Sequence, residues 1–220
     1  MRYELIILDF DGTIADTLDE ITRAFARGFA HLERPAPSHA AVRSAIGCGL
    51  EVSISRLAPD LKGPEIESVV ASFGEAYAAQ KDRHTKLYPG VRPFLERALE
   101  ASAQLVVCSN KDQAALDGAL DRLGVSDRFL LRLGSCAGRP RKPARALWDE
   151  ELAPRLGSVD LTKTLMVGDD LPDLGFAAAI GCDAAWARFG FGDPTACLAR
   201  SPAHQLGTFA DLERVVFTGA

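Results

Sequence analysis

The feature that most constrains the fold is a short apolar run near the start of the chain that ends in acidic residues. No polar residue interrupts Leu5–Leu8, as in a strand buried on both faces of a parallel sheet. Asp9 and Asp11 follow, with Gly12 and Thr13 behind them. If the strand continues this far, alternation places both carboxylates on one side. Such carboxylates predict a bound cation or a reaction that uses them, although Asp is also common in turns and helix caps.

The second part of the chain alternates between strand and helix patterns. Apolar strand-like runs occur at Gln104–Cys108, Phe129–Leu133, Thr164–Val167 and Asp183–Ala187. Helical patterns occur at 91–99, 114–123, 144–156, 174–180 and 209–217, and residues 190–202 are expected to form a loop. Alternation of this kind predicts an α/β fold with a doubly wound parallel sheet and right-handed crossovers.

The segment after the first strand has a different pattern. From about Asp16 to His84 it shows no strand, whereas apolar residues recur at helical spacing between Leu18 and Leu32. Ser38 is expected to cap a second helix, with further helices at 50–57 and from Pro64 onward. One crossover does not need four helices. We therefore expect an all-helical cap at 16–84, inserted into a core domain formed by 1–15 and 85–220.

Composition narrows the class of protein. The chain has 220 residues, a net charge of −5 and a pI of about 5.4, a balance that does not favour nucleic-acid binding. It shows no signal peptide and no apolar run of membrane-spanning length. The five cysteines are widely spaced and form no CxxC motif, which fits a reducing compartment. These properties predict a cytoplasmic protein that binds neither nucleic acid nor membrane; they leave open whether it is a monomer or a homodimer.

Polar residues follow two of the predicted core strands. Ser109-Asn110-Lys111 comes directly after Gln104–Cys108, and a hydroxyl with backbone amides at a strand-to-helix junction suits a phosphate oxygen. Ser109 alone is more often a helix cap. Lys142 lies in a basic loop after the next strand, where its ammonium could hold a phosphate or simply face water.

Three carboxylates follow the strand Thr164–Val167. Asp169, Asp170 and Asp173 lie just beyond its end, and this grouping predicts a hard divalent cation. Mg²⁺ prefers oxygen ligands and keeps several waters, so two or three carboxylates suffice to bind it. One of the three is expected only to cap the helix that follows, with Asp173 as the candidate for a helix starting at Leu174.

Taken in order, these segments resemble the four signature motifs of the haloacid dehalogenase-like (HAD) hydrolases. The string DFDGTIADT is similar to the first motif of the phosphatase branch, and SNK, Lys142 and GDDLPD are similar to the remaining three. The segments YPGV and FGFG are similar to those of the phosphoglycolate phosphatase-like subgroup, which carries a helical cap on a Rossmann-like core. The resemblance covers essentially the whole chain. It departs at Asp170, where many relatives have Ser or Thr, and after Lys142, where Pro-Ala-Arg replaces Pro-x-Pro.

The resemblance implies a role for each matching residue. Asp9 would be the nucleophile that forms an aspartyl-phosphate, and Asp11 the acid and base. The phosphoryl group would be bound by Ser109, Asn110 and Lys142. Mg²⁺ would be held by Asp9, Asp169, Asp173 and the backbone carbonyl of Asp11. Supporting positions behind these ligands would be Thr13 and Asp170, and the cap loop at Gly47 and Gly49 would face the substrate.

The implied function is a Mg²⁺-dependent phosphatase acting on a small phosphorylated metabolite, with 2-phosphoglycolate as the leading substrate. One alternative is a β-phosphoglucomutase-like phosphotransferase, which uses the same core, although DGT with TIADT is more typical of a hydrolase. A second, of another class, is a receiver-type signalling module or a non-catalytic phosphate-binding protein. A receiver, however, carries its acceptor Asp on a later strand than its acidic pair and has no helical cap.

Overall fold

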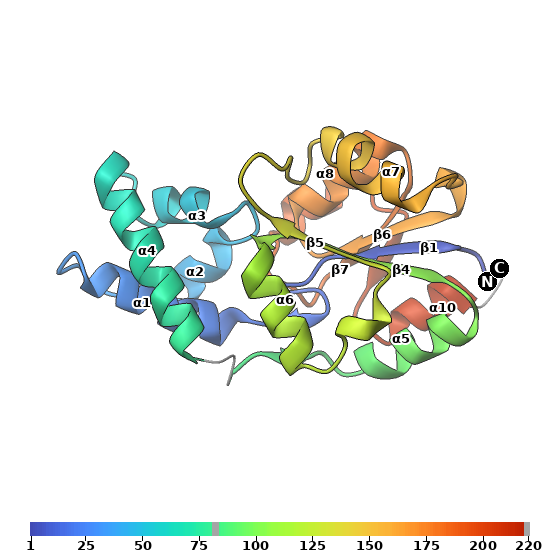
Figure 1. Cartoon of the computed structure of the whole chain (residues 1–220), viewed down its shortest axis with the longest axis horizontal. Helices are drawn as coiled ribbons and strands as arrows, with labels where there is room; N and C mark the ends of the chain where they lie inside the picture. The colour runs from blue at the N-terminus through green and yellow to red at the C-terminus, as the bar shows by residue number, and fades with distance from the viewer. Residues whose placement is uncertain (81–83, 218–220) are drawn as a thin grey trace.

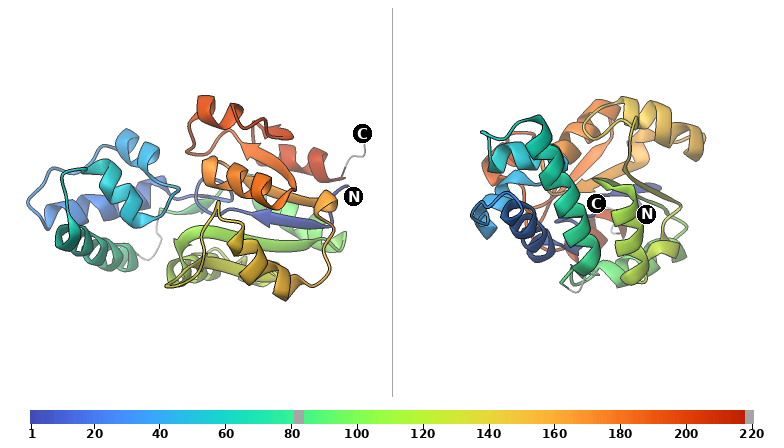
Figure 2. Two further views of the ribbon diagram at one scale, coloured as in Figure 1. Left: turned by 90° about the horizontal axis from the view of Figure 1, so that it is seen from above. Right: turned by 60° about the vertical axis from the view of Figure 1, so that its left-hand side comes forward.

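The computed structural model describes residues 1–80 and 84–217. The predicted cap and core ranges also contain residues 81–83 and 218–220, which lie outside the described residues. A six-stranded sheet with the order β5-β4-β1-β6-β7-β8 forms one part of the molecule, and all its paired strands are parallel. Four helices gather at one end of this sheet, as Figures 1 and 2 show. The predicted α/β class with an all-helical insertion is therefore confirmed.

The strands of the sheet are buried at its centre. Strand β1 (Leu5–Leu8) lies between β4 (Gln104–Asp112) and β6 (Thr164–Gly168). All four of its side chains are buried, with Ile6 and Leu8 packed in one apolar cluster and Leu5 and Ile7 in another. This division between two faces is what an uninterrupted apolar strand requires. The other strands are β5 (Leu131–Ser135), β7 (Asp183–Ala187) and β8 (His204–Leu206).

Helices cover both faces of the sheet. The cluster that contains Ile6 includes residues of α5 (Val91–Glu100), α6 (Gln113–Arg122) and α10 (Asp211–Phe217). The cluster that contains Ile7 includes residues of a π-helical stretch (Leu147–Leu152), α8 (Leu171–Ile180) and α9 (Pro194–Leu198), and α7 (Ala153–Leu156) extends the π-helix. The sheet separates these two layers of helices in the view from above (Figure 2). The result is the two-sided architecture predicted from the alternating pattern.

The inserted helices have a core of their own. They are α1 (Leu18–Ala30), α2 (His39–Ala45), α3 (Leu50–Leu57) and α4 (Gly63–Gln80). A third apolar cluster joins them, and it includes Phe25, Val42, Ile54 and Val69. Ser38 caps α2 as predicted, its side chain accepting a hydrogen bond from the Ala41 N–H at 3.2 Å. A short antiparallel pair, β2 (Ala15–Asp16) with β3 (Lys86–Leu87), links this helical part to the sheet.

Some local predictions differ from the structure. Residues 190–202 are not all loop, because Asp193 caps α9 and Pro194 begins it. Helix α8 begins at Leu171, not at Leu174, since Asp170 is its cap. The strand β4 continues through Ser109–Lys111 to Asp112, with an irregularity after Cys108, so the SNK segment lies in a strand end and not at the start of a helix.

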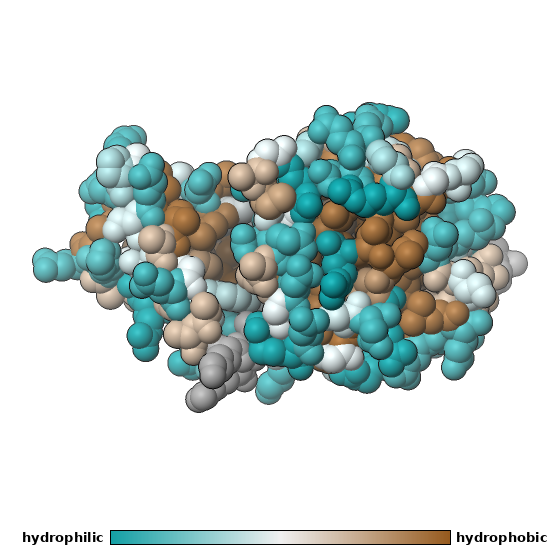
Figure 3. All heavy atoms as spheres, viewed as in Figure 1, coloured by the Kyte–Doolittle hydropathy of each residue, from teal (hydrophilic) through white to brown (hydrophobic). Residues whose placement is uncertain are grey.

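The outer surface agrees with an ordinary globular chain. On the face drawn in Figure 3, hydrophilic side chains cover most of the helices, and hydrophobic atoms show mainly in recesses between them. No helix in the described ranges has both the length and the apolar character needed to cross a membrane. The five cysteines all lie within the described ranges, and each is a free thiol.

Candidate active site

The register of the central strands brings the first and last acidic motifs together. Leu8 of β1 lies opposite Val107 of β4 and Val167 of β6. The residues that follow these positions therefore leave the sheet at one edge, as expected at the carboxyl ends of parallel strands. Asp9 and Asp169 both lie at this edge. One carboxylate oxygen each from Asp9, Asp169 and Asp173 lie within 4.8 Å of one another.

A buried lysine completes this cluster. The Lys142 ammonium donates to Asp9 Oδ1 at 2.7 Å and to Asp173 Oδ1 at 2.6 Å, and its side chain is only 2 % exposed. Burial disfavours the ammonium, but Asp173 and Asp9 outweigh that effect and raise the pKa of Lys142 above its usual value. The alternative of a solvated basic loop is thus wrong for Lys142. The neighbouring Arg141 does face solvent.

The carboxylates themselves are crowded. Burial and the nearby Asp173 raise the pKa of Asp9 to about 6, although Lys142 opposes the shift. The pKa of Asp169 is also raised, by burial first and then by Asp173 and Asp9. Three buried carboxylates next to one ammonium favour a further cation, and a donor set made only of oxygens fits Mg²⁺.

Supporting contacts hold Asp169 and Asp173 in place. The Thr13 hydroxyl donates to Asp169 Oδ1 at 3.0 Å, and the Phe191 N–H donates to Asp169 Oδ2 at 2.6 Å. Asp173 Oδ2 accepts the N–H groups of Asp169 and Asp170, each at 3.1 Å, while Asp170 caps α8. Asp173 thus orients the turn and also faces Lys142. Thr13 thus contacts a member of the carboxylate cluster, whereas Asp170 caps α8 and lines the pocket; their supporting role stays a prediction.

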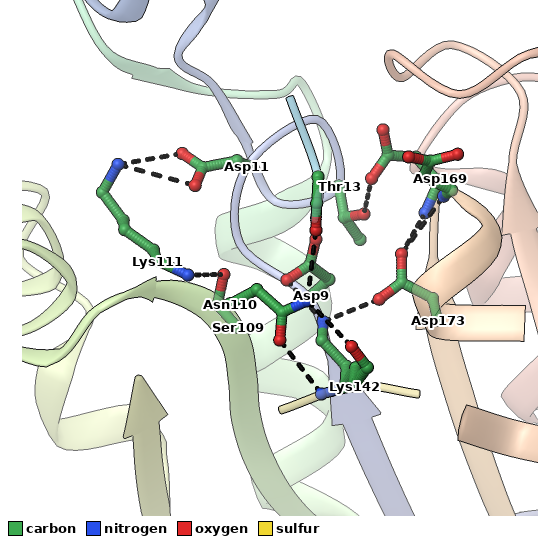
Figure 4. Close-up of polar contacts among 11 residues, drawn as sticks. Asp9, Asp11, Thr13, Ser109, Asn110, Lys111, Lys142, Asp169 and Asp173 are labelled. Carbon is green, nitrogen blue, oxygen red and sulfur yellow. Dashed lines mark hydrogen bonds and ion pairs between the residues drawn. The ribbon is translucent and has the colours of Figure 1, made fainter. Parts of the chain in front are cut away.

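Asp11 lies apart from that cluster. The strand ends at Leu8, and the Phe10 carbonyl accepts three N–H groups of the following turn. The expectation that a continued strand would place Asp9 and Asp11 side by side is therefore not met. The Asp11 carboxylate instead contacts the Lys111 ammonium, at 3.1 Å from Oδ1 and 3.5 Å from Oδ2. In Figure 4, Asp11 and Lys111 lie on one side of Asp9, and Asp169 and Asp173 lie on the other.

Asn110 bridges the two parts of the molecule. Its amide nitrogen donates to the Lys142 and Gly47 carbonyls, at 3.1 Å each, and its Oδ1 accepts the Lys142 N–H at 3.0 Å. The side-chain amide is therefore engaged with backbone, so its phosphate-binding role stays a prediction. Ser109 is buried and lines the pocket above Asp9, where its oxygen accepts the Lys111 N–H at 3.3 Å.

The pocket lies between the helical insertion and the sheet. Asp9, Asp11, Ser109 and Asp169 line it on the sheet side. The loop between α2 and α3 lines it on the other side through Gly47 and Gly49, whose φ angles of 110° and 98° suit glycine. The predicted cap loop thus reaches the pocket. Lining residues to which the sequence assigns no role at the site include Ile21, Phe25, Phe73 and Tyr77.

Lys111 is the most consequential residue that sequence reasoning missed. The SNK string contains it but predicts no role for it, because the spacing of a lysine beside a phosphate motif does not indicate what it contacts. The structure buries it against Asp11. This contact raises the pKa of Lys111 above its usual value even though burial favours the neutral amine. Phe191 could have been found from the FGFG turn, but its N–H contact with Asp169 is a backbone interaction that no side-chain pattern encodes.

Comparison with known proteins agrees with this geometry. The haloacid dehalogenase-like hydrolase family model matches residues 6–187. A phosphoglycolate phosphatase of Chromobacterium violaceum is 27% identical over 212 residues, covering 94% of this chain and 95% of that protein. One of Mesorhizobium japonicum is 28% identical, covering 88% and 86%. The crystal structure of a predicted phosphoglycolate phosphatase from Haemophilus somnus superposes with a TM-score of 0.90 at 24% identity, covering 98% of each chain, and supports the fold. The match of the family model over most of the chain, on a sheet whose strand ends carry all four motifs, shows that this protein belongs to the haloacid dehalogenase-like hydrolases.

Proposed function

We propose that the protein is a Mg²⁺-dependent phosphatase that hydrolyses a small phosphomonoester through a phosphorylated Asp9. The observation that carries the proposal is the Lys142 ammonium, which contacts Asp9 and Asp173 beside Asp169. A carboxylate attacks a phosphate dianion only where positive charge neutralises their repulsion. The cluster offers that charge and an all-oxygen site for a metal at the same place.

The reaction is proposed to proceed in two displacements. In the first, an Asp9 carboxylate oxygen attacks phosphorus, the bond from phosphorus to the alcohol oxygen breaks, and Asp11 gives that oxygen its proton. In the second, water attacks the phosphorus of the phospho-aspartate and gives a proton to Asp11, which releases phosphate and restores Asp9. One acid–base residue serves both steps, because Asp11 gives up a proton in the first and takes one back in the second.

Other residues would position the phosphoryl group. Ser109 lies in the same pocket and can donate its hydroxyl proton to a phosphoryl oxygen. Lys142, which contacts Asp9, would neutralise negative charge on the phosphoryl group. Mg²⁺, bound by Asp9, Asp169, Asp173 and the Asp11 carbonyl, would add electrostatic stabilisation of the transferring group. Asn110 would hold the Lys142 segment through its two hydrogen bonds to that residue.

The helical insertion is proposed to act as the cap, with residues 16–84 as its range and the rest of the chain as the core. The support is its separate apolar cluster and its lining of one side of the pocket. A cap that closes over the substrate excludes bulk water from the first displacement and contacts the leaving alcohol. The five free thiols support a reducing compartment such as the cytoplasm.

The substrate proposed first is 2-phosphoglycolate. The support is that relatives named phosphoglycolate phosphatase match 88–97% of this chain at 26–28% identity. The pocket is also small, with a volume of about 130 Å³. A compact metabolite fits this space better than a large nucleotide would.

The test is phosphate release from a panel of esters that contains 2-phosphoglycolate, a sugar phosphate, a nucleotide and p-nitrophenyl phosphate. We expect release with Mg²⁺ and none with EDTA. Asp9→Asn should lower kcat on the order of 10⁴-fold or more, as loss of a nucleophile does. Asp19→Asn is the matched control, because that carboxylate is 67 % exposed on α1. Release that survives in Asp9→Asn, or no release from any ester, would overturn the proposal.

A further inference from the structure

The walls of the pocket differ in character. On the sheet side they carry six carboxylates, those of Asp9, Asp11, Asp112, Asp169, Asp170 and Asp173. On the cap side the lining residues that the structure describes carry no charged side chain, and most are apolar, among them Phe25, Leu50 and Phe73. The Ser53 hydroxyl already donates to the Ala45 and Gly49 carbonyls. The cap wall is therefore nearly apolar.

Lys111, on the sheet side of the pocket, supplies a cation that faces this cap wall at Tyr77. Among the described residues that line the pocket it is the one lysine or arginine. Its side chain is 7 % exposed, and its ammonium lies 4.4 Å from the centre of the Tyr77 ring and 5.7 Å from that of Phe10. Aromatic faces attract the ammonium but accept no proper hydrogen bond from it. Asp11 is its carboxylate partner, and the proposed reaction uses Asp11 but gives Lys111 no task.

Tyr77 adds a second polar group at the same place. Its hydroxyl is buried, and the Lys111 ammonium beside it can only donate to its oxygen, so within the described chain the hydroxyl proton has no acceptor. A buried donor without an acceptor is costly, on the order of 1–3 kcal/mol. A buried donor of this kind, in a pocket and next to an ammonium, is matched by an anionic oxygen of a ligand.

The position of this pair relative to Asp11 defines what it could bind. As the acid, Asp11 must lie within about 2.6–3.2 Å of the leaving oxygen of the ester. The Lys111 ammonium is itself 3.1 Å from the Asp11 carboxylate. A carboxylate attached to the carbon next to the leaving oxygen is separated from that oxygen by only two bonds. It would therefore fall within reach of the ammonium and of the Tyr77 hydroxyl.

We propose that Lys111 and Tyr77 form a subsite for an anionic group on the leaving alcohol, next to the oxygen that Asp11 protonates. The inference rests on the proposed function and adds the residues that would select the substrate. Lys111 of the sheet would select a negatively charged leaving group, while the cap supplies the Tyr77 hydroxyl and apolar walls. Leaving groups with many hydroxyls would be disfavoured, because those walls leave hydroxyls without partners.

The experiment compares 2-phosphoglycolate with its amide, in which a neutral group of the same size replaces the carboxylate. For the wild type we expect kcat/KM to be at least about tenfold higher for the acid, because a charge-assisted contact is stronger than a neutral one. Lys111→Met should bring that ratio to within about threefold of one, and Lys111→Arg should restore part of it. Tyr77→Phe should lower the ratio by about three- to tenfold.

The ratio separates this role from a merely positional one. If Lys111 only orients Asp11, Lys111→Met slows both esters by the same factor, and the proposal is wrong. A wild type that prefers the amide overturns it as well. Hydrolysis of p-nitrophenyl phosphate without either glycolate ester would overturn the subsite but leave the phosphatase standing; no hydrolysis at all would overturn both.

A measurement on the wild type guards against variants that do not fold. Glycolate, the expected product alcohol, should inhibit hydrolysis of p-nitrophenyl phosphate at concentrations about tenfold lower than glycolamide does. Equal inhibition by the two, or stronger inhibition by glycolamide, would contradict an anion subsite even if no variant could be purified.

Discussion

At the scale of single residues, the carboxylate cluster depends on glycines that let it pack closely. A Cβ atom built on Gly168 would lie 2.2 Å from the Asp173 Cβ, and one on Gly190 would lie 2.2 Å from the Asp169 Cβ. Real Cβ atoms do not approach other atoms so closely. Neither glycine has a positive φ, so the requirement there is space and not backbone conformation. The acidic residues can converge because these neighbours have no side chain.

We expect Gly190→Ala to displace Asp169, since its new methyl group would also lie 2.5 Å from the Gly12 carbonyl oxygen. Overpacking of this kind lowers the free energy of unfolding by about 1–3 kcal/mol, and displacement of Asp169 should lower kcat as well. The measurements are chemical denaturation and phosphate release.

Gly74→Ala is the matched control for this change. It places the same methyl group on α4, where nothing lies within 4 Å, and alanine in a helix is favoured over glycine by about 1 kcal/mol. The control should therefore be more stable than the wild type and equally active. If Gly190→Ala behaved like Gly74→Ala, the close packing around Asp169 would not matter.

At the scale of elements, the loop between α2 and α3 and its neighbours hold the cap against the core. Arg43 of α2 donates to the Gly190 carbonyl and lies 6.0 Å from the centre of the Phe191 ring. Asn110 contacts the Gly47 carbonyl from the sheet side. These contacts join residues of the helical insertion to residues of the sheet domain, so they depend on how closely the two parts approach.

Arg43→Met should therefore weaken closure. We expect kcat/KM to fall by about three- to thirtyfold, because one charged hydrogen bond contributes roughly 1–2 kcal/mol, whereas the free energy of unfolding should change little. Steady-state kinetics and thermal denaturation measure the two effects. Arg27→Met, at an exposed position of α1, should leave both unchanged. A loss of stability in Arg43→Met as large as the loss of activity would argue against a closing contact.

The elements also show what sequence alone could and could not predict. Among the buried strands, β1 and β7 begin and end at the predicted residues, whereas β5 lies at Leu131–Ser135 and not at the predicted Phe129–Leu133. The edge strand β8 was missed, because His204–Leu206 is only three residues long and its central residue is exposed. Part of 144–156 forms π-helix instead of α-helix. That segment contains Pro154, which lacks the N–H that a regular helix uses.

The candidate site likewise has contacts that the sequence predicts and contacts that it does not. Asp9, Asp169, Asp173 and Lys142 come together because each lies at or beyond a strand end, and strand order follows from fold class. The contact between Lys111 and Asp11, by contrast, depends on the irregularity at the end of β4. Contacts created by such an irregularity, or by a loop from the other part of the molecule, have no signal in residue spacing.

At the scale of the whole molecule, the end of the sheet far from the pocket is joined by a polar cluster. The Tyr3 hydroxyl donates to Asp183 Oδ2 at 2.5 Å and lies 2.8 Å from His204 Nε2, while Arg2 forms an ion pair with Asp183. Burial, and then the Arg2 charge, lower the pKa of His204, with Asp183 opposing them. This cluster ties the start of the chain to β7 and β8.

The stabilisation that this cluster contributes should therefore fall on mild acidification. A histidine with a lowered pKa in the folded state binds its proton more weakly than the unfolded chain does, whose histidines titrate near about 6.5. Stability is then full above that value and is lost as the pH falls toward the folded pKa. Between pH 7.5 and 5.5, denaturation should show a smaller loss for His204→Gln than for the wild type. His31→Gln, which alters an exposed histidine, should match the wild type; an equal loss in all three would contradict the assignment.

The short ladder between β2 and β3 has a consequence for how such a molecule can change over evolutionary time. Ala15 pairs with Leu87 and Asp16 with Lys86, so the chain leaves the sheet and rejoins it at neighbouring points. An insertion with adjacent ends can be lengthened, shortened or replaced without moving the strands on either side. The carboxylates proposed to act in the reaction and Lys142 all lie outside it. Replacement of this one helical insertion would thus change the pocket wall that faces the substrate, while the residues proposed for the reaction stay the same.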